Sequence, residues 1–184
     1  MMHKMIAMLA LPAALALAQD LPVPVFAPPT CETLACDAQN DWMRNDFMFY
    51  GVADAMPAEH YGFKPTPEQQ SFGERVLHVA QVNVMLLATL GGKAEAPEID
   101  PAATSKDEAL AALRAVSAYG NALMKEFSDG NRLTERVAAP WFMGPMASRQ
   151  SILYFLMMHT QDTYGQLVVY LRLNGIVPPL SRLP

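Results

Sequence analysis

The stretch that decides the fold lies near the carboxyl end of the chain and reads His159-Thr-Gln-Asp-Thr-Tyr-Gly-Gln-Leu-Val-Val-Tyr-Leu-Arg-Leu-Asn-Gly175. Apolar residues recur at helical spacing on both sides of His159, so the pattern predicts a helix with this histidine on an otherwise apolar face. Ser148 is a suitable N-cap for this helix, and Gly175 suits the left-handed position after its last turn. Pro178 then prevents the helix from continuing.

Three further segments upstream show the same helical spacing of apolar residues. Ser71 and Glu74 form a Ser-x-x-Glu capping box at the start of one of them, and Ser105 and Glu108 repeat this pattern at the start of another. The chain shows no convincing alternating strand and no internal repeat, and we expect residues 131–147 to form an irregular apolar loop over one end of the fold. The sequence therefore predicts an all-α four-helix bundle. The predicted helices span about 40–56, 71–90, 105–127 and 148–174.

The first 18 residues have the composition of a cleaved secretory signal. Lys4 precedes an apolar run, and Ala16-Leu17-Ala18 supplies the small-x-small cleavage pattern. The run is shorter than the roughly 20 apolar residues that span a bilayer, so we expect no stable membrane anchor. The sequence thus predicts export to the periplasm or the medium. Residues 19–37 form a proline-rich tether that carries the cysteines, and 38–180 form the bundle domain.

Two cysteines, Cys31 and Cys36, are the only ones in the chain. In an exported protein such a close pair favours a structural disulfide, whereas redox-active pairs usually have the Cys-x-x-Cys spacing. The formal net charge is −5 and no basic patch is present. Nucleic acids and anionic membrane surfaces are therefore poor candidates for partners.

Three stretches of the chain resemble the DinB-like superfamily, and the resemblance covers about residues 38–180. They are Met56-Pro-Ala-Glu-His-Tyr-Gly-Phe-Lys-Pro-Thr-Pro67, Ser71-Phe-Gly-Glu-Arg-Val-Leu-His78, and His159 with the Tyr-Gly-containing helix that ends in Ile-Val-Pro-Pro179. The resemblance implies a four-helix bundle that holds a divalent metal with three histidines. Two of them map onto His78 and His159, and Thr163 occupies the position of the third.

Asp162 offers another route to a complete metal site. It lies three residues after His159, close to the same helix face, and two histidines with one carboxylate would form a facial triad. Such a site suits zinc or iron(II), with manganese and nickel as further candidates. Whether Asp162 points inward depends on the rotation of the helix, which spacing alone does not determine.

Two interpretations of the histidines remain open at this point. In the first, His78, His159 and Asp162 hold a divalent metal, and the exported protein is a hydrolase or a thiol-dependent transferase that acts on a small molecule. In the second, the histidines are neutral core residues and the bundle has lost its metal. It would then bind a small ligand without catalysis, or form a homodimer through exposed helix faces.

Overall fold

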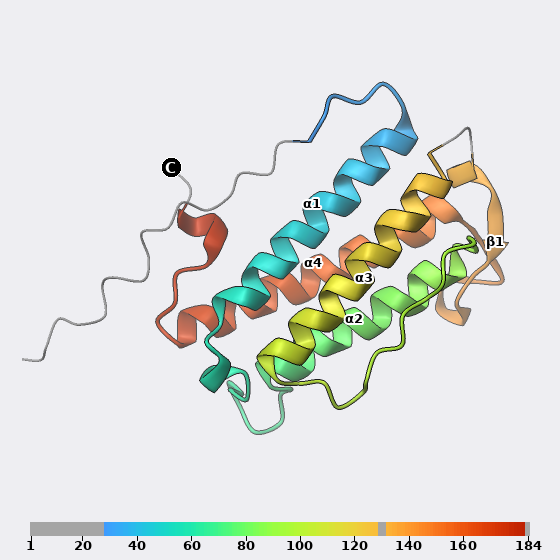
Figure 1. Cartoon of the computed structure of the whole chain (residues 1–184). Coiled ribbons are helices and arrows are strands. Elements are labelled where there is room, and N and C mark those ends of the chain that lie inside the picture. The colour runs from blue at the N-terminus through green and yellow to red at the C-terminus, as the bar shows by residue number, and fades with distance from the viewer. Residues whose placement is uncertain (1–27, 129–131, 183–184) are drawn as a thin grey trace, which may run out of the picture.

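The computed structural model describes residues 28–128 and 132–182, and within these ranges it contains four long helices and one short β-hairpin (Figure 1). The predicted signal peptide, residues 1–18, and residues 19–27 of the predicted tether lie outside the described residues. The long helices are α1 (Leu34–Ala55), α2 (Phe72–Thr89), α3 (Lys106–Glu126) and α4 (Arg149–Leu173). The strands are β1 (Arg136–Ala138) and β2 (Met146–Ser148), and the short 3₁₀ turns are η1 (Ala58–His60), η2 (Arg132–Thr134), η3 (Trp141–Met143) and η4 (Pro179–Arg182).

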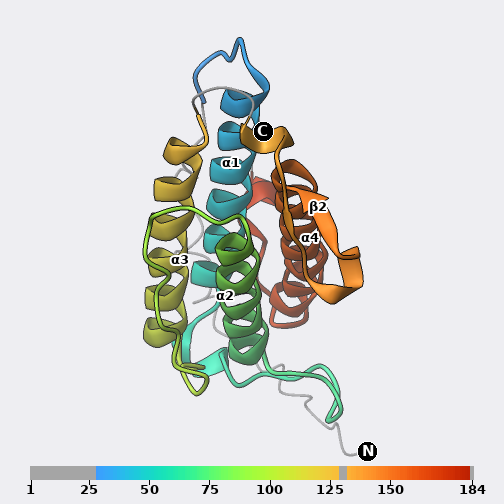
Figure 2. The same cartoon turned by 90° about the vertical axis from the view of Figure 1, so that its right-hand side faces the viewer.

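The helices form a bundle in which α1 and α2 lie diagonally and each packs against both α3 and α4 (Figures 1 and 2). The connection between α2 and α3 returns along the bundle, so these two neighbours run parallel. At one end the backbone of Thr104 lies against Gly73, and at the other the amide of Lys93 donates a hydrogen bond of 2.8 Å to Glu126. Helix α2 also packs against α4, and these two run antiparallel, since Arg149 at the start of α4 bonds to Leu90 at the end of α2.

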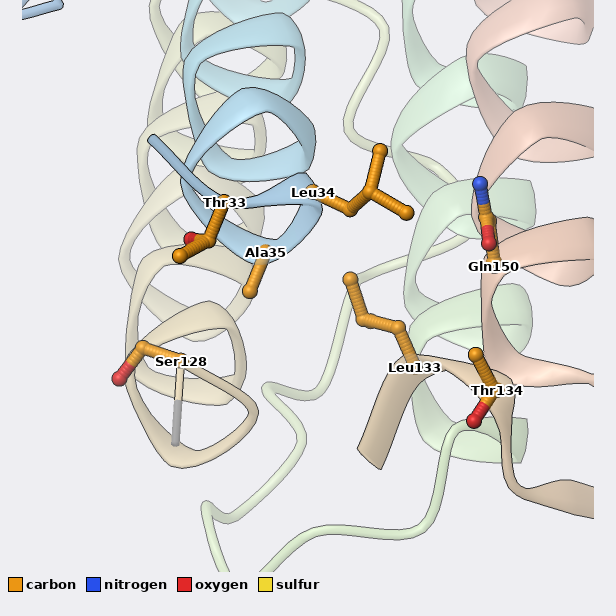
Figure 3. Close-up of a pocket in the computed structure, with 7 residues that line it drawn as sticks. All are labelled: Thr33, Leu34, Ala35, Ser128, Leu133, Thr134 and Gln150. Atoms are coloured by element: carbon orange, nitrogen blue, oxygen red, sulfur yellow. The ribbon is translucent and has the colours of Figure 1, made fainter. Parts of the chain in front are cut away.

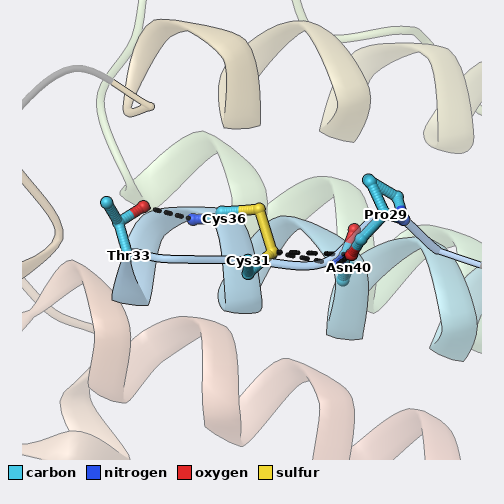
Figure 4. The surroundings of a disulfide bond; sticks show 5 residues. All are labelled: Pro29, Cys31, Thr33, Cys36 and Asn40. Atoms are coloured by element: carbon cyan, nitrogen blue, oxygen red, sulfur yellow. Dashed lines mark hydrogen bonds between the residues drawn. A yellow bond between two sulfur atoms is a disulfide. The ribbon is translucent and has the colours of Figure 1, made fainter.

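Helix α1 begins at Leu34, about six residues earlier than the spacing of apolar residues predicted. The Thr33 side chain accepts a hydrogen bond of 3.2 Å from the amide of Cys36 and caps the helix. Cys31 and Cys36 form a disulfide with a Cα–Cα distance of 5.4 Å, and the Asn40 side chain donates to the carbonyl of Pro29 at 2.9 Å (Figure 4). The cysteine pair thus closes the first turn of the helix onto the segment before it.

The capping residues of α2 and α4 act as predicted, whereas those of α3 do not. Ser71 and Glu74 make both bonds of a capping box, and Ser148 accepts a hydrogen bond of 3.1 Å from the amide of Ser151. Ser105 makes no capping bond, because its hydroxyl donates instead to the carboxylate of Glu108. The prediction of a second capping box was therefore wrong.

The end of α4 has the predicted glycine stop. Gly175 has a φ of 72°, and the amide of Ile176 donates a hydrogen bond of 3.0 Å back to the carbonyl of Leu171. This is the six-to-one bond of a Schellman motif, which satisfies a carbonyl in the last turn.

The segment predicted as an irregular loop contains the β-hairpin. Strand β1 pairs antiparallel with β2, and the hairpin lies beside α4 (Figure 2). Arg149 fixes its base: the buried guanidinium donates to the carbonyl of Leu90 at 2.6 Å and to that of Arg132 at 3.0 Å, and it pairs with Glu135. These bonds join the start of α4 to the end of α2.

Candidate functional site

The two predicted histidines meet across the contact between α2 and α4. The Nε2 atoms of His78 and His159 lie 3.2 Å apart, and the ring centroids are 5.1 Å apart with an interplanar angle of 61°. Both side chains are half-buried. This geometry is a hydrogen bond in which one neutral imidazole donates and the other accepts.

Hydrogen bonds between α2 and α4 flank the histidine pair on both sides. Toward the end of α2, the hydroxyl of Thr160 donates to the buried side chain of Asn83 at 3.2 Å. Toward its start, the Nε of Arg75 donates to the hydroxyl of Tyr170 at 3.0 Å, and this hydroxyl donates to the carbonyl of Gln70 at 2.9 Å. Because both sides are fixed, the register of the two helices places the imidazoles opposite each other.

The surroundings favour the neutral form of both rings. Burial lowers the pKa of His78 below 6.5, and the nearby charge of Arg75 lowers it further. Burial and the neighbouring His78 lower the pKa of His159, while Asp162 opposes this shift. Both imidazoles are therefore neutral at pH 7, the state in which a ring nitrogen can bind a metal ion.

The separation of the two Nε2 atoms fits a shared metal ion. Zinc binds imidazole nitrogen at about 2.0–2.1 Å, so two such nitrogens on one tetrahedral ion lie about 3.3 Å apart. The observed distance is 3.2 Å. His78 and His159 thus present two nitrogens at a spacing that fits one shared ion.

The rest of a coordination sphere is not assembled around this pair. Asp162 is exposed on α4 and accepts a hydrogen bond of 2.8 Å from Gln166, and Thr163 is buried. Within residues 28–128 and 132–182, no group of three or more His, Cys, Asp and Glu side chains is placed to hold a metal ion. The structure therefore brings together two of the three predicted ligands and leaves Asp162 outside the pair.

One polar atom of the pair is left without a partner. The Nδ1 atom of His159 is buried and makes no hydrogen bond. A histidine that binds a metal usually donates its second ring N–H to a carboxylate, a carbonyl or water. Here the carboxylate of Asp162 is close enough to affect the pKa of His159 but is bonded to Gln166 instead.

Sequence reasoning missed the groups that hold the pair in register, namely Arg75, Asn83 and Thr160. Asn83 and Thr160 are buried polar residues on helices with mainly apolar inner faces. This was the signal available in the sequence, because a polar residue at a core position needs a partner across the helix contact.

A cavity of about 220 Å³ opens at the end of the bundle where α1 and α4 begin and α3 ends (Figure 3). Among the described residues that line it, none is a histidine and none has an acidic or basic side chain. We therefore place the candidate chemistry at the histidine pair. The cavity is lined by Thr33, Leu34, Ala35, Ser128, Leu133, Thr134 and Gln150.

Comparison with known proteins identifies the family of this arrangement. The family model of the DinB superfamily matches residues 39–167. The fold is similar to the crystal structure of a DinB-like protein from Bacillus cereus ATCC 10987, with a TM-score of 0.66 and 19% sequence identity over 77% of this chain and 93% of that one. No functionally curated protein matches the chain.

Proposed function

The chain belongs to the DinB superfamily, and from this premise we propose that it is a metal-dependent hydrolase or transferase whose divalent ion is bound by His78 and His159. One observation carries the proposal: the two Nε2 atoms lie 3.2 Å apart on helices whose register is fixed on both sides. Zinc, iron, manganese and nickel all accept imidazole nitrogen as a ligand, so the proposal covers any of these four divalent ions.

Asp162 is the proposed third ligand. Its carboxylate lies about one turn after His159 on the same helix and accepts a hydrogen bond from Gln166, which it would exchange for the metal. Two histidines and one carboxylate leave open positions for water or substrate. An ion bound in this way supplies a Lewis acid and lowers the pKa of bound water or thiol.

The remaining residues of the site hold and orient these groups. Arg75 places a positive charge one helical turn from His78 while its Nε stays bonded to Tyr170, so it can orient an anionic or carbonyl group of a substrate. We propose that the substrate is a small molecule. We also propose that the protein acts after export, and this proposal rests on the signal-like composition of residues 1–18. No helix within the described part of the chain is long and apolar enough to cross a membrane.

The proposal is tested by removing metal with a chelator and restoring zinc, iron(II), manganese or nickel one at a time. Each sample is assayed against esters, amides and thiol conjugates of small molecules. We expect turnover that returns with one of the ions and is absent from the His78→Ala, His159→Ala double variant. No turnover with any ion, or equal turnover by the double variant, would contradict the proposal.

A second candidate function is a non-catalytic bundle that binds a small ligand or a second copy of itself. The presence of Thr163 where the superfamily has its third histidine favours this alternative. A protein of this kind would bind its ligand equally well with and without metal. It would therefore show saturable binding in chelator and no turnover in the assays above.

A further inference from the structure

The tip of the β-hairpin packs against α4 next to the histidines, and its side chains form an exposed apolar surface there. Trp141 is 90% exposed and Phe142 42% exposed. The ring of Phe142 packs against Trp141 at 5.6 Å and against Phe155 of α4 at 5.1 Å between centroids. We call Trp141, Phe142 and Phe155 the aromatic strip.

The aromatic strip leads directly to the histidine pair. Phe155 is four residues before His159, so the two side chains are neighbours on one face of α4. On the antiparallel helix α2, the half-buried Val82 is four residues after His78 and therefore lies on the same side. Apolar side chains thus flank the imidazoles on the side that faces the hairpin.

Charged side chains flank the imidazoles on the opposite side. Arg75 precedes His78 by one turn and Asp162 follows His159 by one turn, and each is close enough to shift the pKa of its histidine. Along α4 the distance from Phe155 to Asp162 is about 10 Å, at 1.5 Å per residue. The site therefore changes from aromatic to charged over the length of a small molecule, with the histidines in between.

We propose that this site binds a small amphiphilic substrate, with its aromatic or aliphatic group on Phe142 and Phe155 and its carboxylate or carbonyl group toward Arg75. This inference rests on the proposed function, since it names the substrate class of the same site. A molecule bound in this way places the bond between its two ends at His78 and His159. The short span and the change from apolar to charged fit such a molecule better than an extended peptide.

Phenylbutyrate tests the inference because it has an aromatic ring and a carboxylate at the two ends of a short chain. Binding is measured by calorimetry and by the emission of Trp141, which is distinguished from that of the only other tryptophan, Trp42, because Trp42 is 1% exposed. We expect saturable binding of phenylbutyrate with a change in Trp141 emission. Butyrate, which lacks the ring, should bind more weakly by about tenfold or more.

Two variants locate the binding surface. Phe142→Ala should weaken phenylbutyrate binding by about tenfold, since it removes an aromatic contact. Val169→Ala is the control, because Val169 is an exposed apolar residue of α4 that lies more than two turns beyond His159, and this variant should bind as the wild type does. Equal weakening by both changes, or no saturable binding up to the solubility limit, would overturn the inference.

The same titration in the His78→Ala, His159→Ala variant separates this inference from the proposed function. If the aromatic strip holds the ligand, phenylbutyrate binding is largely retained in that variant although metal and turnover are lost. Saturable binding by the wild-type protein without turnover in the presence of any of the ions would contradict the proposed function alone. Loss of binding in Phe142→Ala with unchanged metal content confirms that the strip acts on the ligand and not on the ion.

Discussion

Gly120 of α3 lies directly against the indole ring of Trp42 in α1, so that a methyl group at position 120 would overlap the ring. The next residue, Asn121, accepts a hydrogen bond of 3.0 Å from the indole nitrogen. Trp42 is among the largest fully buried side chains of the core. This contact sets how closely α1 and α3 approach, because only a residue without a Cβ fits there.

Gly120→Ala should destabilise the protein by about 1–3 kcal/mol, since the added methyl group forces the packed indole ring to shift. Gly165→Ala is the matched control, because Gly165 is a solvent-exposed residue in the middle of α4 and no atom lies near the position of its missing Cβ. It should stabilise the fold by about 0.5–1 kcal/mol through the better helix propensity of alanine. Urea unfolding measures both, and a loss of stability in the control equal to that of Gly120→Ala would contradict the packing account.

Ser71→Ala should cost about 1 kcal/mol of stability, because Ser71 accepts the hydrogen bond that caps α2. Ser105→Ala should cost less than about 0.5 kcal/mol, since Ser105 is at the corresponding position of α3 without making a capping bond. The comparison is made by chemical unfolding of both variants. Equal losses of stability in the two variants would contradict the stabilising role of the capping box of α2.

Asp46→Asn should make the protein slightly more stable at pH 7, by less than about 1 kcal/mol. Burial raises the pKa of Asp46 above 3.8, and a hydrogen bond of 2.7 Å from Ser117 lowers it in part. A raised pKa means that the stability this carboxyl contributes is fully present below pH 3.8 and is lost as the pH rises through the raised value. The difference between variant and wild type, followed by thermal unfolding, should therefore shrink as the pH falls toward 3.8. A variant that is less stable than the wild type at pH 7 would contradict this sign.

Thr163→His should raise the affinity for zinc by about tenfold or more, because it adds an imidazole four residues after His159 on the same helix face. Thr163→Leu provides a control of similar bulk without a ligand atom at this buried position. Competition with a zinc-binding dye measures both affinities, and circular dichroism checks that both variants are folded. Equal affinities in the two variants would show that the side chain at 163 does not face the ion.

The sequence predicted the four helices well because each has a strong apolar spacing. It missed the start of α1, where the Thr33 cap and the disulfide extend the helix into a segment that has no apolar face. It also missed the β-hairpin, because strands of three residues such as Arg136–Ala138 are too short to show alternation. These elements are held by contacts such as those of Arg149, which joins residues far apart in the chain.

The candidate site was predictable only in part, for a similar reason. Spacing and the superfamily resemblance identified His78 and His159, and the structure places their Nε2 atoms together. The register that brings them together depends on Asn83 and Thr160, which meet only in three dimensions. The direction of Asp162 depends on the rotation of α4 and on its bond to Gln166, and neither can be read from a spacing of three residues.

The central claim is that His78 and His159 together bind a divalent metal ion, and metal content tests it most directly. Inductively coupled plasma mass spectrometry is applied to the tag-free protein, exported to a periplasm, and to the His78→Ala, His159→Ala variant. We expect about one zinc, iron, manganese or nickel ion per chain in the wild type and its loss in the variant. A wild-type protein that takes up none of these ions, even after incubation with each, would contradict the claim and make the two histidines structural.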